Sequence, residues 1–181
     1  MSIGFVMSGP DNDSYMLRGP GSPPVCQSCG LLSDRAWIDP GFEMRVRRFD
    51  VSYTYDGYLI VSERFRDIAE EAGTRCISLP SVSGFYSLLV ENEVPFDTVR
   101  RRTRFEQPCD ECGRYFVVAG ATPAFLKVEA ELPDQMFRTD LEFGTGNEQH
   151  PLIIAGPRTA DRLLVAGFDG LDLTPVGNAG S

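Results

Sequence analysis

The sequence contains two Cys-x-x-Cys-Gly motifs, at residues 26–30 and 109–113. Each motif places two thiols in one tight turn, and its glycine can adopt the positive φ that turns backbone N–H groups toward the sulfur atoms. One such motif is a weak signal. Two of the same form, with Pro24 and Pro108 just upstream, indicate a tetrahedral zinc site made of two cysteine knuckles. The predicted ligands are four thiolates, from Cys26, Cys29, Cys109 and Cys112.

The two motifs are far apart for a zinc finger. The cysteine pairs of a local finger are separated by roughly 12–20 residues, whereas much of the chain lies between Cys29 and Cys109. We therefore expect the metal ion to join two distant segments of one fold.

Redox and disulfide chemistry are the alternatives for these thiols. A thioredoxin-like motif follows a strand and opens a helix, whose N-terminus lowers the thiol pKa; residues 23–25 and 107–108 lack the pattern of such a strand. Two disulfides would need an oxidising compartment, and residues 1–10 lack the basic and apolar regions of a signal peptide. We therefore expect a cytoplasmic protein in which these cysteines bind zinc.

Length and composition indicate one soluble domain. The chain has 181 residues, of which 42% are hydrophobic, and no apolar run approaches the roughly 20 residues of a membrane helix. We expect a flexible N-terminus over residues 1–13, a single domain over 14–176 and a flexible tail over 177–181. The formal net charge of −9 disfavours nucleic acid and anionic membranes as partners and favours basic proteins.

The chain contains two similar strand–helix–strand units. In the first, residues 58–61 form a strand, Ser62 caps a helix that runs to Ala72, and residues 76–79 form the return strand. In the second, residues 152–154 form the strand, a helix runs from Pro157 to Gly167, and residues 171–174 return. Identical residues favour an internal duplication: Ile60/Ile154, Arg64/Arg158, Asp67/Asp161, Ala72/Ala166, Gly73/Gly167, Leu79/Leu173 and Val82/Val176.

Further strands are predicted from short β-branched and aromatic runs bounded by glycine or proline. They cover residues 14–18, 44–55 with a break near Arg48, 85–90, 98–105, 115–119 and 125–128. Strands then outnumber helices. The prediction is an α+β fold, in which a mixed β-sheet carries the two helices of the duplicated units and is tied by the zinc site.

The sequence gives little support for catalysis. His150 is the only histidine and lies in no nucleophile motif, so we interpret it as a turn residue before Pro151. Cys76 begins a strand and is interpreted as a buried structural thiol. We therefore predict no catalytic residue.

A basic cluster leaves a second interpretation open. Arg100, Arg101, Arg102 and Arg104 precede the second cysteine motif, and zinc ribbons with basic residues often bind DNA or RNA. If residues 98–105 form a strand, three of these arginines share one face, as on a protected sheet edge. The net charge of −9 argues against phosphate binding, so a nucleic-acid-binding or regulatory protein is kept as the alternative.

The paired motifs resemble those of the double-CXXCG paralogous family of myxobacteria. The segments DGYLIVSERF (residues 56–65) and MFRT (residues 136–139) are also similar to segments of bacterial immunity proteins. Members of the double-CXXCG family resemble the immunity partners of swarming-inhibition toxins. The resemblance spans about residues 14–176 and implies a protein that binds and neutralises a cognate toxin.

An acidic stretch is the predicted partner surface. Residues 127–148 contain six acidic and two basic residues and show little apolar periodicity. A toxin that acts on nucleic acid or membrane is usually basic, because its target is anionic, and an acidic face would steer it electrostatically. We expect Glu129, Glu131, Asp134, Asp140 and Glu142 to border the toxin-binding surface.

Overall fold

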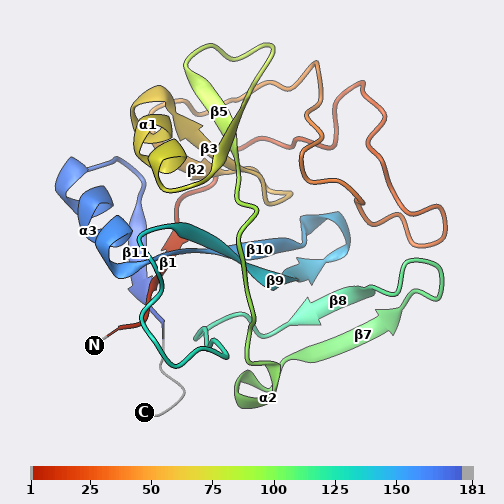
Figure 1. Ribbon diagram of the computed structural model, residues 1–181. Helices are drawn as coiled ribbons and strands as arrows, with labels where there is room; N and C mark the ends of the chain where they lie inside the picture. Colours follow the sequence, from red (N-terminus) through yellow and green to blue (C-terminus); the bar gives the residue numbers. More distant parts are fainter. Residues whose placement is uncertain (1, 177–181) are drawn as a thin grey trace.

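Two β-sheets and three α-helices form residues 2–176, the part of the chain that the computed structural model describes (Figure 1). In chain order the elements are β1 (Phe5–Ser8), β2 (Val51–Tyr53), β3 (Leu59–Ser62), α1 (Glu63–Glu71), β4 (Arg75–Ser78), β5 (Phe85–Leu89), β6 (Glu93–Val94), α2 (Thr98–Arg101), β7 (Arg104–Pro108), β8 (Tyr115–Ala119), β9 (Met136–Thr145), the 3-10 turn η1 (Gly146–Glu148), β10 (His150–Ala155), α3 (Pro157–Ala166) and β11 (Asp172–Pro175). The predicted α+β class is confirmed, but the strands form two sheets where one mixed sheet was predicted, and a short third helix, α2, is present in the described residues.

The strands form one larger and one smaller sheet. The larger sheet has the order β11-β1-β10-β9-β8-β7, and the short β6 pairs in parallel with β9. The smaller sheet has the order β2-β3-β5-β4 and is antiparallel. Within residues 2–176, no helix has the length and apolar content needed to cross a bilayer.

The hydrophobic core lies between the sheets and on their outer faces. Successive residues of a strand point to opposite faces, so Leu59 and Val61 of β3 join the cluster that contains Ile153 of the larger sheet. Ile60, between them, belongs to a second cluster, which residues 16–44 cover. Ile154 belongs to a third cluster on the other face of the larger sheet. The central strands β3 and β10 are therefore buried on both faces.

The two longer helices begin and end as their capping residues predict. At the start of α1, the hydroxyl of Ser62 accepts a hydrogen bond from the N–H of Phe65 at 3.3 Å. Gly73 follows α1 with φ of +81°, and Gly167 follows α3 with φ of +62°. The predicted helices at residues 63–72 and 157–166 are confirmed to within one residue.

Each strand–helix–strand unit contains an inserted strand. β5 lies between β3 and β4, and β1 lies between β10 and β11, with antiparallel pairing throughout. Ile77 faces the same residue of β5 as Ile60, and Thr174 faces the same residue of β1 as Ile154. When the two units are compared by strand register, Ile77 of the first unit therefore occupies the position of Thr174 in the second. The identities at 79/173 and 82/176 do not occupy equivalent positions, because the connection after the helix is longer in the second unit.

The flexible N-terminus predicted for residues 1–13 is wrong over its described part. Phe5–Ser8 form β1 in the interior of the larger sheet, where β10 and β11 satisfy its backbone on both sides. Ile3, Val6 and Met7 are buried. The tail predicted for residues 177–181 lies outside the described residues.

Several predicted strands also differ from the structure. Residues 14–18 have no regular secondary structure, and residues 44–55 contribute only β2. Residues 98–105 form α2 and the start of β7, because the carboxylate of Asp97 accepts the N–H of Arg100 at 3.0 Å and caps a helical turn. Residues 125–128 contain only an isolated bridge, from Leu126 to Phe96. The longest strand, β9, lies in the acidic stretch and was not predicted.

Candidate metal centre

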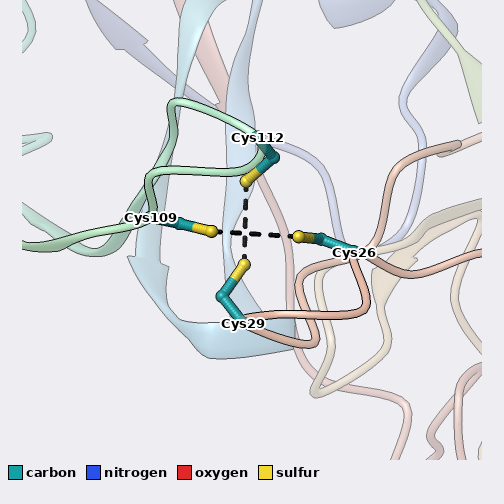
Figure 2. A group of neighbouring side chains, drawn as sticks. All are labelled: Cys26, Cys29, Cys109 and Cys112. Carbon is teal, nitrogen blue, oxygen red and sulfur yellow. Dashed lines mark hydrogen bonds between the residues drawn. The ribbon is translucent and has the colours of Figure 1, made fainter.

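The tip of the β7–β8 hairpin carries the second cysteine motif. Pro108 of β7 pairs with Tyr115 of β8, so residues 109–114 form the connecting turn. The first motif lies in an irregular segment, where an isolated bridge between Val25 and Leu32 joins the two ends of its turn. Figure 2 shows the two turns facing each other, with all four cysteine side chains pointing toward one centre.

The two turns share one pattern of backbone hydrogen bonds. In each, the N–H of the first cysteine donates to the carbonyl five residues later, at 2.9 Å from Cys26 and at 2.8 Å from Cys109. The N–H of each glycine donates back to the carbonyl of that cysteine, at 2.8 and 2.9 Å. Gly30 and Gly113 have φ of +74° and +70°, which a residue with a Cβ atom rarely adopts. The two glycines therefore have the positive φ that the motif predicted.

The four sulfur atoms converge. Every pair of Sγ atoms lies within 4.8 Å, and the Cys26–Cys109 and Cys29–Cys112 pairs lie at 3.8 and 3.7 Å. Four sulfurs at about 2.3 Å from one tetrahedral metal ion would lie about 3.8 Å apart, whereas a disulfide joins its sulfurs at about 2.05 Å. The structure thus brings the four predicted ligands together in an arrangement that is compatible with a metal site.

The thiols influence one another's ionisation. The pKa of Cys109 is lowered to about 6, chiefly because the backbone N–H of Cys112 stabilises its thiolate, with help from the N–H of Glu111. The N–H of Leu31 lowers the pKa of Cys29, but burial and the three neighbouring thiols outweigh it and raise this pKa to about 12. Four thiolates this close repel one another, so a cation at their centre would be needed for all of them to be ionised.

His150 and Cys76 have structural surroundings. His150 begins β10 beside Tyr53, at 5.8 Å between ring centroids, and burial lowers its pKa. Its Nδ1 lies 3.1 Å from the carbonyl oxygen of Glu148. Cys76, in β4, packs against the core between the sheets, and burial raises its pKa to about 12. Over residues 2–176, neither side chain is hydrogen-bonded to a serine, cysteine or acidic side chain.

The five acidic residues predicted at the partner surface have different surroundings. Glu129 and Glu131 are exposed in the loop before β9. Asp134 accepts a hydrogen bond from a threonine hydroxyl of α3 at 2.7 Å, and Asp140 accepts one from a backbone N–H that precedes α2 at 2.9 Å. Glu142 is only 16% exposed and forms ion pairs within the protein. Three of the five carboxylates therefore already have partners in the fold.

The ion-pair partners of Glu142 are Arg35 and Arg114, which sequence reasoning missed. Arg114 directly follows the second cysteine motif, and this adjacency was the available signal. Arg35 also follows a cysteine motif, but it is not adjacent to the end of that motif at Gly30. Nothing local in the sequence indicates that Glu142, on β9, lies between them.

The arginines of residues 100–104 do not share one strand face. Arg100 lies in α2, with its guanidinium carbon 4.3 Å from the ring centre of Phe125, and Arg102 adopts a left-handed conformation at the end of that helix. Arg104 begins β7, which ends the sheet and is exposed along its length, within the described residues. Of Arg100, Arg102 and Arg104, which were predicted to share one face of an edge strand, only Arg104 lies in the edge strand β7.

The chain matches no protein-family model and no curated protein. The resemblance to the double-CXXCG family therefore depends on the two cysteine motifs and the short segments of the sequence.

Proposed function

We propose that this protein is a non-enzymatic, cytoplasmic immunity protein that holds one structural zinc ion and neutralises a toxin by binding it. The convergence of four sulfur atoms from two distant turns is the observation that carries the zinc centre. The immunity role is supported by the resemblance of the paired motifs and of residues 56–65 to proteins of that class.

Zinc is the metal that this donor set favours. Four thiolates in a tetrahedral arrangement suit Zn²⁺ or iron, and paired cysteine turns of this form are typical of structural zinc. With all four positions filled by protein ligands, the ion has no open position for water or substrate. The centre would therefore hold two segments together and take no part in a reaction.

Metal analysis of the purified protein tests the zinc centre. One zinc ion per chain is expected, and replacement by Co²⁺ should give the intense absorption of tetrahedral thiolate coordination. Protein that is folded, purified from zinc-supplemented cells and free of metal would overturn this part of the proposal.

The proposed partner is a basic toxin. The chain carries a net charge of −9, and Glu129 and Glu131 are exposed beside Asp134 in the loop before β9. Asp140 is exposed as well. Opposite charge on the toxin would raise the association rate, and the effect would fade as salt shortens the Debye length to about 8 Å at physiological strength. Glu142 is left out of the proposed toxin-binding surface, because its carboxylate is mostly buried and forms ion pairs with Arg35 and Arg114.

Co-expression tests the immunity role. A secreted or lipoprotein toxin encoded beside this chain should arrest growth when produced alone in the cytoplasm, and this protein should restore growth and co-purify with it. A charge-reversed Glu129→Lys/Glu131→Lys variant is the matched control for the acidic surface. Failure of the folded wild-type protein to bind or to protect would refute the role.

The β7–β8 hairpin favours a second candidate function, nucleic-acid binding. It presents the half-exposed rings of Phe105 and Tyr115, 5.1 Å apart between centroids, together with Arg104, and aromatic rings among arginines can stack on unpaired bases. Labelled DNA and RNA mixed with the protein at low salt distinguish the two candidates. Salt-dependent binding that Phe105→Ala abolishes would favour nucleic acid over a toxin.

A further inference from the structure

Arg114 connects the two cysteine turns directly. Its Nη1 donates to the carbonyl oxygen of Leu32 at 2.6 Å, and Leu32 closes the turn of the first motif through its bridge to Val25. The carbonyl of Arg114 in turn accepts the N–H of Cys109 at 2.8 Å and closes the turn of the second motif. One residue is therefore part of the second turn and hydrogen-bonded to the first, without the use of any sulfur atom.

Glu142 fixes the guanidinium of Arg114. Its Oε2 accepts from Nη2 of Arg114 at 2.6 Å, and its Oε1 lies 3.5 Å from Nε of Arg35. Arg35 also donates from Nη1 to the carbonyl oxygen of Asp56 at 3.0 Å. The carboxylate is thus held between one arginine that follows each motif. The contact of Glu142 with Arg114 is a charge-assisted hydrogen bond that is partly shielded from water, because the Glu142 side chain is only 16% exposed. Its contact with Nε of Arg35 is an ion pair without a hydrogen bond.

Two side chains from the connection between β9 and β10 form hydrogen bonds to the backbone next to the two cysteine turns. The side-chain oxygen of Asn147 accepts the N–H of Leu32 at 2.9 Å. The amide of Gln149, which is 2% exposed, donates to the carbonyls of Tyr115 and Phe116 at 2.8 Å each. Both cysteine turns are therefore hydrogen-bonded, directly or through the start of β8, to the β9–β10 hairpin of the larger sheet.

We propose that Arg114, held in place by Glu142, is a positioning residue that fixes the two cysteine turns in their metal-binding arrangement. This inference depends on the zinc centre of the proposed function and goes beyond it. An ion that binds turns already held together does not have to restrict their motion itself, so it binds more tightly and leaves more slowly. The guanidinium of Arg114 donates to the carbonyl of Leu32, to the carboxylate of Glu142 and, at 3.5 Å, to the side-chain oxygen of Gln149, and it provides no ligand to the ion.

Arg138 provides a matched control on the same sheet. It lies on β9, is 30% exposed against 35% for Arg114, and forms an ion pair with Glu93. It makes no hydrogen bond to either cysteine turn among the described residues. Arg138→Met therefore removes the same charge and one ion pair but leaves the cysteine turns connected.

Zinc affinity and zinc release test the proposal. Competition with a chromophoric chelator should show that Arg114→Met weakens zinc binding about tenfold to a hundredfold and speeds its transfer to excess chelator, while Arg138→Met stays within about twofold of the wild type. The Co²⁺ spectrum of Arg114→Met should keep its tetrahedral thiolate bands, because the four ligands are unchanged. Affinity within about twofold of the wild type for Arg114→Met would overturn the proposal.

The outcomes separate this proposal from the zinc centre itself. A wild-type protein that binds neither zinc nor cobalt overturns both. A wild type that binds zinc, with an Arg114→Met variant of equal affinity and release rate, overturns only the positioning role. If Arg114→Met fails to fold, Glu142→Gln is used, since it keeps the shape and removes the charge. Its zinc release should be faster by more than about threefold, and an unchanged rate would overturn the proposal.

Discussion

Replacing Cys109 by serine should destabilise the whole fold through loss of the proposed zinc ion. Cys109 is 7% exposed, and the substitution removes one ligand with little change in volume. An ion that binds only the folded state at about 1,000 times its Kd stabilises that state by about 4 kcal/mol. In a domain of 150–250 residues, each kcal/mol shifts Tm by about 2–4 °C, so a fall of roughly 8–16 °C is expected.

Thermal unfolding with and without chelator measures this effect. Chelator should lower the Tm of the wild type to that of Cys109→Ser and should leave the variant unchanged. Cys76→Ser is the matched control, since Cys76 lies in β4 outside the cluster; it should keep its zinc and lose only a few degrees through weaker packing. A Cys109→Ser protein that retains the zinc content and Tm of the wild type would refute the reasoning.

His150→Ala and Cys76→Ala should leave protection against the toxin intact, because neither side chain has a catalytic partner within residues 2–176; a folded variant that no longer protects would show a chemical role. Reversing Glu129 and Glu131 to lysine should slow association with the toxin, most strongly at low salt, and leave dissociation nearly unchanged in stopped-flow measurements. An association rate that is indifferent to salt would rule out steering. Ser62→Ala should lower the free energy of unfolding by about 1 kcal/mol, since its hydroxyl caps α1, and a denaturant midpoint equal to that of the wild type would contradict this.

The elements that sequence reasoning located are those with local determinants. Both longer helices carry their stop signals within a few residues, in Gly73 and Gly167, and the strands that flank them are short apolar runs. β1 was missed because its stability comes from two partners at the far end of the chain. β9 was missed because buried residues along it do not alternate strictly, and its pairing with β10 shifts register between Pro151 and Ile153.

The candidate site divides in the same way. The four sulfurs could be predicted because each motif encodes its own turn, through a glycine at positive φ and a repeated backbone hydrogen bond. The residues that hold the turns could not, since Glu142 and Gln149 lie on a hairpin distant in the sequence from Arg114. No local sequence pattern predicts the ion pair between Arg114 and Glu142, because only the folding of the larger sheet brings these two residues together. The partner surface was the least constrained prediction, because exposed acidic residues obey no packing rule.

The position of the cysteine cluster explains why its two motifs are so far apart in sequence. On one side of the fold, the sheets are joined where Arg64 of α1 donates to the carbonyl of Gly167 at 2.9 Å and where Phe65 meets Phe168 at 4.9 Å between ring centroids. On the other side, the first motif belongs to the segment that covers the smaller sheet, and the second belongs to a hairpin of the larger sheet (Figure 1). A cavity of about 520 Å³, lined by residues 33–36 and by parts of β5, β9 and β10, lies between the sheets. A local zinc finger would stabilise only its own loop. Ligands divided between the two segments would instead fix one sheet against the other where α1 and α3 do not reach.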